Sequence, residues 1–302
     1  SVSIKRGWHD MGIAQHQIPS FILIGAQKAG TTWLWDNLKQ HPDVALPKAK
    51  EIHFFGGVEN YRKGSDWYYQ HFQGVPLTKV TGEASTTYLY DYLPYWDNPS
   101  GELKHDYSLP CIPELVLKEL PEVKILVILR NPVSRALSAY RHYVKSGKIP
   151  RGFGPTEVAL KIPIFRILEL GFYARYLKLW KQYFPPHRIR IFVFEDDVVK
   201  SPEKSLRQIF EFLEINPNFQ PRKVNGRVHE GWSWTRCAIN QQTFPLARRI
   251  ANGQVGKIFD RFDLLKNGKA MRSDMAFFQD RYRQEKKELE NILGKHLDSW
   301  KY

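Results

Sequence analysis

A continuous apolar run, a glycine-bounded loop and a helical pattern follow one another near the start of this chain. Phe21 to Ile24 (FILI) has the apolar character of a fully buried strand, and Gly25 and Gly30 bound the loop that comes next. Thr31 to His41 then places tryptophan and leucine side chains at helical spacing. A buried strand, a tight loop and a helix in this order predict one unit of an α/β fold.

The same unit recurs further along the chain. Lys124 to Leu129 (KILVIL) is a second apolar strand, and Pro132 suits the first turn of the helix that follows it. A third strand is expected at Arg188 to Phe194. Further helices are expected at 171–184, 201–213 and 273–293. Alternating strands and helices predict a central parallel sheet flanked by helices on both faces.

No change of composition and no Gly/Ser-rich linker divides the 302 residues. We therefore predict a single domain, 1–302, with its core in residues 18–300. The stretch from Asp91 to Cys111 is rich in Pro, Asp and Tyr, which is typical of a surface excursion. Because long loops in compact domains often cover active sites, we interpret this insertion as a candidate substrate lid.

The charge balance of the chain indicates the charge of its ligands. Lys and Arg number 45 against 31 Asp and Glu, so the formal net charge is +14, which favours anionic ligands. The basic residues are scattered along the chain, and no stretch interleaves aromatics with Gly and Arg as RNA-binding segments do. We expect no nucleic-acid partner.

Cysteine usage and the lack of targeting signals bear on the compartment. Only Cys111 and Cys237 are present, which argues against a disulfide-built fold. The N-terminal stretch has no apolar signal core, and no run approaches the ~18 apolar residues of a membrane span. These features favour a cytoplasmic protein with no membrane partner. A lumenal catalytic domain whose anchor was removed is the alternative.

The loop between the first strand and its helix has the outline of a phosphate loop with a displaced lysine. Gly25 and Gly30 keep the spacing of a nucleotide triphosphatase loop, but Lys28 lies inside the loop and Thr31 stands where the lysine should follow. The backbone N–H groups from Gly30 to Thr32 remain available to cradle an anion. This arrangement suits a 5′-phosphate better than a triphosphate.

The second strand ends in a cation instead of an acid. A triphosphatase places a metal-binding Asp near such a strand end, whereas this chain has Arg130 in LRNP. Arg130 and Ser138, about two helical turns apart, can grip a second phosphate. Two phosphate grips indicate a bisphosphorylated nucleotide. Neither His41 nor His142 belongs to a cluster with metal-ligand spacing, so we expect no metal.

At this point the residues resemble a known family. Phe21 to Trp33 resembles the 5′-phosphosulfate loop of the sulfotransferases that use 3′-phosphoadenosine 5′-phosphosulfate (PAPS), and Leu129 to Ser138 resembles their 3′-phosphate site. Glu51 to Phe72, which begins EIHFFGG, is similar to the heparan sulfate N- and 3-O-sulfotransferases. The resemblance implies the phosphate-loop-like sulfotransferase fold, with PAPS as co-substrate and 3′-phosphoadenosine 5′-phosphate (PAP) as product.

The resemblance also implies roles for individual residues. Glu51 is expected to be the catalytic base, and Lys28 to neutralise the bridging oxygen as PAP leaves. In a strand, His53 would face the same side as Glu51 and would orient the acceptor or share the proton. The loop around Gly226 resembles the Lys-Gly-Arg loop that closes on the 3′-phosphate, with Asn225 in place of its lysine. The expected nucleotide contacts are Gln27, Lys28, Ala29, Gly30, Thr31, Thr32, Arg130, Ser138, Lys223, Gly226 and Arg227.

The chain departs from the heparan sulfate enzymes on the acceptor side. Their Glu-Lys-Thr/Ser segment supplies an active-site lysine, but here Ala84 follows Glu83. We expect Glu83 to hydrogen-bond the acceptor or to orient Lys28, and Tyr95 and Trp96 to contact the acceptor. The late disulfide loop of that group is absent too, so the resemblance points to a bacterial, cytoplasmic relative with another acceptor.

The sequence thus predicts an enzyme that transfers a sulfuryl group from PAPS to a hydroxyl, less readily an amine. The acceptor is a carbohydrate or a small metabolite, free or attached to a carrier, and the oligomeric state is left open. Two alternatives remain at this stage. One is a metal-dependent kinase or nucleotide triphosphatase; the other is a basic non-catalytic module that binds glycans or nucleic acid.

Overall fold

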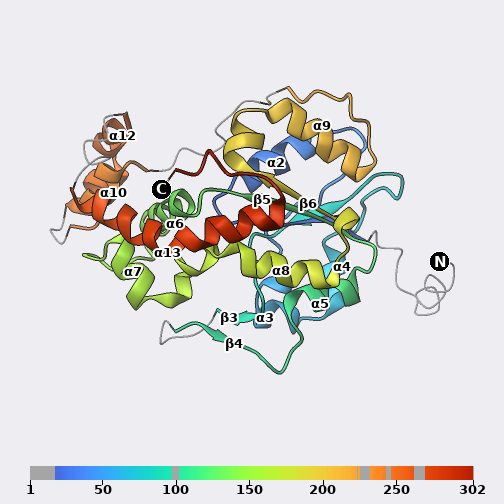
Figure 1. Cartoon of the computed structure of the whole chain (residues 1–302), viewed down its shortest axis with the longest axis horizontal. Coiled ribbons are helices and arrows are strands. Elements are labelled where there is room, and N and C mark those ends of the chain that lie inside the picture. Colours follow the sequence, from blue (N-terminus) through green and yellow to red (C-terminus); the bar gives the residue numbers. More distant parts are fainter. Residues whose placement is uncertain are drawn as a thin grey trace.

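A four-stranded parallel sheet forms the centre of the described part of the chain (Figure 1). The structure is a computed structural model that describes residues 18–96, 102–222, 224, 232–242, 246–261 and 269–301. The strand order is β2-β1-β5-β6, with bounds β1 Phe21–Gly25, β2 Gly82–Ala84, β5 Lys124–Leu129 and β6 Ile189–Val193. The predicted α/β class with a central parallel sheet is confirmed.

The apolar runs form strands because the sheet is covered on both faces. Every residue of β1 is buried, and so is all of β5 except half-buried Lys124. The register pairs Phe21 with Lys124 and Ile125 with Ile189. All three predicted strands are therefore present. The sequence missed β2, which has only three residues and so carries no readable periodicity.

Helices connect the strands and cover the sheet. In Figure 1, α2 and α9 lie on one side of the sheet, and α5 and α8 lie on the other. The helices are α2 Thr31–Leu38, α3 Val58–Tyr61, α4 Ser65–Gln70, α5 Ile112–Glu119, α6 Pro132–Lys145, α7 Pro155–Lys161, α8 Tyr173–Tyr183, α9 Pro202–Leu213, α10 Trp234–Asn240, α11 Ala247–Asn252, α12 Gln254–Arg261 and α13 Lys269–Leu293. The predicted helices are present, although α2 ends before His41 and α13 begins four residues earlier than expected.

The long C-terminal helix builds a second buried cluster beside the sheet. Helix α13 packs along α6 and α8 (Figure 1). Side chains of α6, α7, α10 and α13 form this cluster, which includes Leu137, Val158, Cys237 and Phe278. Within the ranges that the structure describes, no helix is both long and apolar enough to cross a bilayer.

The insertion at 91–111 contains a short hairpin outside the sheet. Strands β3 (Pro94–Tyr95) and β4 (Lys104–His105) pair antiparallel in a separate sheet, and Figure 1 places them well away from β5 and β6. Residues 97–101 between them lie outside the described residues. The described parts of the insertion thus form a hairpin outside the central sheet. The surface excursion, its role as a lid and the single-domain organisation of the whole chain stay predictions.

Candidate functional site

The loop from β1 to α2 has the backbone of an anion cradle. Lys28 and Gly30 both adopt left-handed conformations, with φ of 66° and 93°. A Cβ on Gly30 would lie 2.7 Å from Cδ2 of Phe194, so only glycine fits this turn without a shift. Gly30 precedes the first residue of α2, and the first N–H groups of a helix have no partner within it. The loop therefore presents free donors where the sequence predicted them.

Positive charge converges on Lys28. Burial lowers the pKa of Lys28, and the charges of Arg130, Arg141, Lys145 and Lys50 lower it further. Four cations near a partly buried ammonium are unfavourable unless an anion binds among them. The electrostatics of the loop therefore suit a ligand with several negative charges.

Arg130 joins the end of β5 to the loop. Its Nη1 donates a hydrogen bond to the backbone oxygen of Lys28 at 3.0 Å. Its guanidinium carbon lies 5.1 Å from the ring centre of Phe194, and its Nε is 4.0 Å from a carboxylate oxygen of Glu195. Burial lowers the pKa of Arg130, and Glu195 raises it. The arginine is thus held in place beside the loop, as the sequence predicted.

Gln27 faces the other side of the loop, toward α6. Its Nε2 donates to the hydroxyl oxygen of Tyr143 at 3.0 Å. Ser138 lies half-buried on the same helix, eight positions after Arg130. Lys223, Gly226 and Arg227, predicted to close on the 3′-phosphate, lie outside the described residues.

The Glu51 carboxylate is held by groups on three sides. Its Oε2 accepts hydrogen bonds from the backbone N–H of Thr86 at 2.9 Å and from Thr86 Oγ1 at 3.3 Å. Its Oε1 accepts from Lys50 Nζ at 3.2 Å, and His53 Nε2 lies 3.6 Å from Oε2. About a quarter of the side chain is exposed, 28%, so the carboxylate remains open to a substrate.

Glu51 and His53 meet through turns and not along a strand. Both adopt left-handed backbone conformations, with φ of 62° and 57°, so the expectation of a strand at this point was wrong. The backbone N–H of Glu51 donates to the oxygen of Ala84, and that of His53 donates to Ser85 Oγ, each at 3.0 Å. These bonds fix two strained turns, which aim both side chains at one point.

His53 is set up to be neutral. Burial lowers its pKa below 6.5, and this effect outweighs the opposing charge of Glu51. Its Nδ1 is 2.9 Å from Thr87 Oγ1, which leaves Nε2 directed at Glu51. A neutral imidazole beside a carboxylate can take up or pass on one proton near neutral pH.

Glu83 lies beneath the site and does not face it. The residue has no exposed surface, and its Oε1 accepts hydrogen bonds from the hydroxyls of Tyr68 and Tyr88, both at 2.8 Å. Its Oε2 accepts from Ser85 Oγ at 2.9 Å. Burial raises the pKa of Glu83 to about 7. The expectation that Glu83 contacts the acceptor or Lys28 is therefore corrected, since protein hydroxyls occupy both oxygens.

Glu83 instead supports the turn at His53 through Ser85. The Ser85 hydroxyl donates to Glu83 and accepts from the backbone N–H of His53. This chain of two hydrogen bonds connects a buried carboxylate to the turn that carries His53. Glu83 is thus a positioning residue of the site.

Lys50 is a site residue that the sequence reasoning missed. Its Nζ lies 3.2 Å from Thr32 Oγ1 on α2 and 3.2 Å from Glu51 Oε1. Neighbouring side chains of an extended chain point apart, so adjacency to Glu51 gave no reason to expect this contact. The left-handed turn at Glu51 brings the two side chains together. Lys50 supplies a cation next to the Glu51 carboxylate in a chain that has Ala84 where the resemblance places a lysine.

Trp96 reaches the site from the insertion, whereas Tyr95 is bound elsewhere. Trp96 Nε1 donates to the oxygen of Gly56 at 2.7 Å, and the N–H of Gly56 donates to the oxygen of His53. The indole, 36% exposed, therefore lies one turn from His53. The Tyr95 hydroxyl donates to Asp106 at 2.8 Å, which ties it to its own hairpin.

The fold and the site together define a class: a nucleotide-dependent transferase with a cationic phosphate loop and a carboxylate beside it. A family model described as "Sulfotransferase domain" matches residues 19–234, and the chain belongs to this family. A solved sulfotransferase from Alicyclobacillus acidocaldarius has a TM-score of 0.62 at 23% identity, over 94% of this chain and 99% of that one. The predicted phosphate-loop-like sulfotransferase fold is confirmed.

Curated relatives agree with the predicted subgroup. Heparan sulfate glucosamine 3-O-sulfotransferase 5 of Mus musculus is 29% identical over 258 residues, which cover 82% of this chain and 66% of that protein. Bifunctional heparan sulfate N-deacetylase/N-sulfotransferase 2 of Homo sapiens is 30% identical over 217 residues, covering 67% of this chain and 22% of that protein. The chain thus spans just under two thirds of the first relative and about a fifth of the second.

Family membership bears on the three functional classes that the sequence left open. It supports a sulfotransferase, and it favours neither a kinase or triphosphatase nor a non-catalytic binding module. Within the described ranges, no group of three or more His, Cys, Asp or Glu side chains is arranged to hold a metal ion.

Proposed function

We propose that this chain transfers a sulfuryl group from PAPS to a hydroxyl, less readily an amine, and releases PAP. One observation carries the proposal: Lys50 joins Thr32, at the start of α2, to Glu51, at 3.2 Å on each side. A single lysine, Lys50, therefore connects the candidate base to the helix start that forms part of the anion cradle. Sulfuryl transfer needs this proximity, because the acceptor oxygen must approach the sulfur in line while it loses its proton.

The residues present fit PAPS. Its phosphosulfate supplies an activated sulfuryl group, and the free N–H groups at Gly30 to Thr32 and the Lys28 ammonium complement its charge. Arg130 lies at the adjacent strand end with a buried Nε that has no hydrogen-bond acceptor among the described residues. These donors are placed for an anion with two separated phosphate groups.

The chain's own groups then have distinct tasks. Glu51 takes the proton of the acceptor hydroxyl, held in orientation by Thr86 and Lys50. His53, neutral and 3.6 Å from Glu51, shares that proton or orients the acceptor. Lys28 neutralises the charge that develops on the departing phosphate oxygen.

The acceptor is a carbohydrate or a small-molecule metabolite, free or attached to a carrier. The exposed indole of Trp96, one turn from His53, supports a ring-shaped acceptor because aromatic faces stack well on ring faces. The relatives named above are heparan sulfate enzymes, whereas Ala84 supports a different acceptor for this chain. We further propose a cytoplasmic location, to be tested by cell fractionation.

The test separates catalysis from binding. Glu51→Gln is compared with wild type and with Glu211→Gln, an exposed carboxylate on α9, in transfer of labelled sulfate from PAPS to a panel of sugars and hydroxylated metabolites. We expect Glu51→Gln to lose about 10²-fold or more in turnover. PAP affinity, measured by titration calorimetry, should stay within about twofold of wild type, since the carboxylate does not bind the nucleotide. Unchanged turnover would overturn the assignment of the base.

A further inference from the structure

A cavity of about 230 Å³ lies beside Arg130, where α6, α10 and α13 meet. It is lined, among others, by Arg130, Ser134, Leu137, Arg141, Trp234 and Met275. One wall is cationic and polar, and the other consists of aromatic, leucine and methionine side chains. Since Arg130 also touches the phosphate loop, the cavity continues the site already described.

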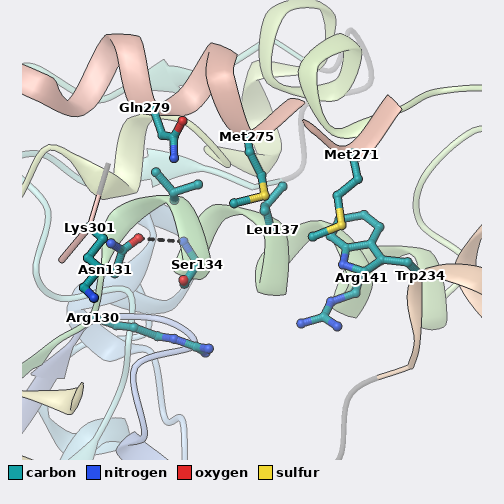
Figure 2. Close-up of a pocket in the computed structure, with 11 residues that line it drawn as sticks. Arg130, Asn131, Ser134, Leu137, Arg141, Trp234, Met271, Met275, Gln279 and Lys301 are labelled. Carbon is teal, nitrogen blue, oxygen red and sulfur yellow. Dashed lines mark hydrogen bonds between the residues drawn. The ribbon is translucent and has the colours of Figure 1, made fainter. Parts of the chain in front are cut away.

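Arg141 lies on the same face of α6 as Ser134 and Ser138. Ser134, Ser138 and Arg141 are spaced by four and then three positions, which places them in one row along a helix. Figure 2 shows the guanidinium groups of Arg130, which precedes α6, and of Arg141, within α6, on the same side of the helix. Ser138 lies in the helix between them.

The guanidinium of Arg141 keeps donors that the protein does not use. Its Nη1 donates to the backbone oxygen of Trp232 at 3.3 Å, and its carbon lies 5.3 Å from the ring centre of Trp234. Its Nε is buried without a hydrogen-bond acceptor, and no carboxylate in the described ranges forms an ion pair with it. A half-buried guanidinium with a buried, unpaired Nε and no carboxylate partner is unfavourable, so the environment of Arg141 favours an anion.

The two arginines act on the same region of space. The charge of Arg141 lowers the pKa of both Lys28 and Arg130, so its field reaches the nucleotide loop. Arg130 likewise has a buried Nε without an acceptor, and its nearest carboxylate oxygen is 4.0 Å away. Two cations that repel each other across one cavity gain most from a doubly charged group between them.

We infer that Arg141 forms a clamp with Arg130 and Ser138 around the 3′-phosphate of the nucleotide, and that Arg141 sets the preference for 3′-phosphorylated nucleotides. This inference rests on the proposed function, and it adds a residue to which neither the motifs nor the resemblance gave a role. The Trp234 ring helps to hold the guanidinium through a cation–π contact. A nucleotide with a free 3′-hydroxyl leaves Arg141 unused and gains nothing from it.

The experiment measures the affinities of PAP and 5′-AMP for wild type, Arg141→Met and Arg281→Met by titration calorimetry. Arg281 is a matched control, because it is exposed on α13, lies 3.6 Å from the ring centre of Phe277 and donates to a backbone oxygen. We expect Arg141→Met to lower the affinity for PAP by roughly 10- to 100-fold, because the variant loses a charge-assisted contact. We expect 5′-AMP affinity to change by less than about threefold in the same variant.

Other outcomes overturn the inference in distinguishable ways. Equal losses for PAP and 5′-AMP, or unchanged PAP affinity, would remove Arg141 from the 3′-phosphate site while leaving the proposed function intact. Failure of the wild type to bind PAP would overturn the proposed function and the inference together. If Arg141→Met is destabilised in thermal melts, Arg141→Lys serves instead. It keeps the charge but loses the planar fork, so its PAP affinity should be lower than that of wild type while its 5′-AMP affinity changes by less than about threefold; unchanged PAP affinity would again remove Arg141 from the 3′-phosphate site.

Discussion

The Lys50 ammonium lies 3.2 Å from Oε1 of Glu51, and through this contact the nucleotide loop and the base share one cation. Lys50 also donates to Thr32 Oγ1 on α2, at 3.2 Å, so one ammonium group contacts both the start of α2 and the carboxylate. In the proposed reaction, this side chain would link the sulfuryl-donor side of the site to the acceptor side.

Replacing Lys50 tests this coupling. Lys50→Met should reduce turnover by about 10- to 100-fold, because the site loses a cation near the transferring group and the base loses an orienting contact. PAP affinity should fall much less than turnover. Steady-state kinetics and calorimetry on Lys50→Met and on Lys48→Met, an exposed lysine two positions away, check this. Equal effects of the two substitutions would contradict it.

Protonation of His53 should cause the decline of kcat at acid pH. Since burial lowers its pKa below the usual 6.5, the imidazole gains its proton at a lower pH than an unperturbed histidine does. Turnover should therefore decline on the acid side at a lower pH than an unperturbed histidine would cause. In His53→Asn this decline should disappear, while overall turnover drops. A profile of kcat against pH that is identical in shape for both proteins would rule out this role.

Glu83 should make the fold more stable in mild acid than at pH 7.5. Its pKa is raised from 4.5 to about 7, so the folded chain binds a proton that the unfolded chain releases between those values. The free energy of unfolding should fall as the pH rises through this window and level off above it. Glu285, whose pKa burial also raises to about 7, acts in the same direction.

Urea denaturation at pH 5 and pH 7.5 separates the two carboxyls. Glu83→Gln and Glu285→Gln should each remove part of the pH dependence, and the double variant should remove most of it. A pH dependence that survives in the double variant would show that other groups cause it.

Gly30 should not tolerate a side chain. A Cβ at this position meets Phe194 at 2.7 Å, and φ is 93°, so Gly30→Ala combines a clash with backbone strain. We expect a loss of about 2 kcal/mol or more in stability, together with weaker PAP binding. Gly74→Ala is the control, because Gly74 has a φ of 75° but no atom within 4 Å of its Cβ position. Its loss should be smaller and should leave PAP binding unchanged.

The strands and the loop could be predicted from the sequence because each depends on a short, local pattern of residues. The buried strands are uninterrupted apolar runs, and the two glycines of the loop mark turns that only glycine adopts easily. Arg130 was found for the same reason, as a cation directly after such a run.

The remaining features depend on contacts between distant segments. Strand β2 is held by pairing with β1 and has no pattern of its own. Glu51 and His53 take left-handed turns because bonds to Ala84 and Ser85 fix them, and only this geometry brings in Lys50. Burial of Glu83 results from two tyrosines that fold over it. The spacing of residues along the chain therefore cannot predict these contacts.

The most direct test is titration calorimetry of PAP and, separately, of Mg-ATP into wild type and Arg130→Ala at moderate salt. We predict micromolar PAP binding that is lost in Arg130→Ala, with weak ATP binding in both proteins. Tight, metal-dependent ATP binding together with indifference to PAP would contradict the account of this site as a PAPS-dependent sulfotransferase.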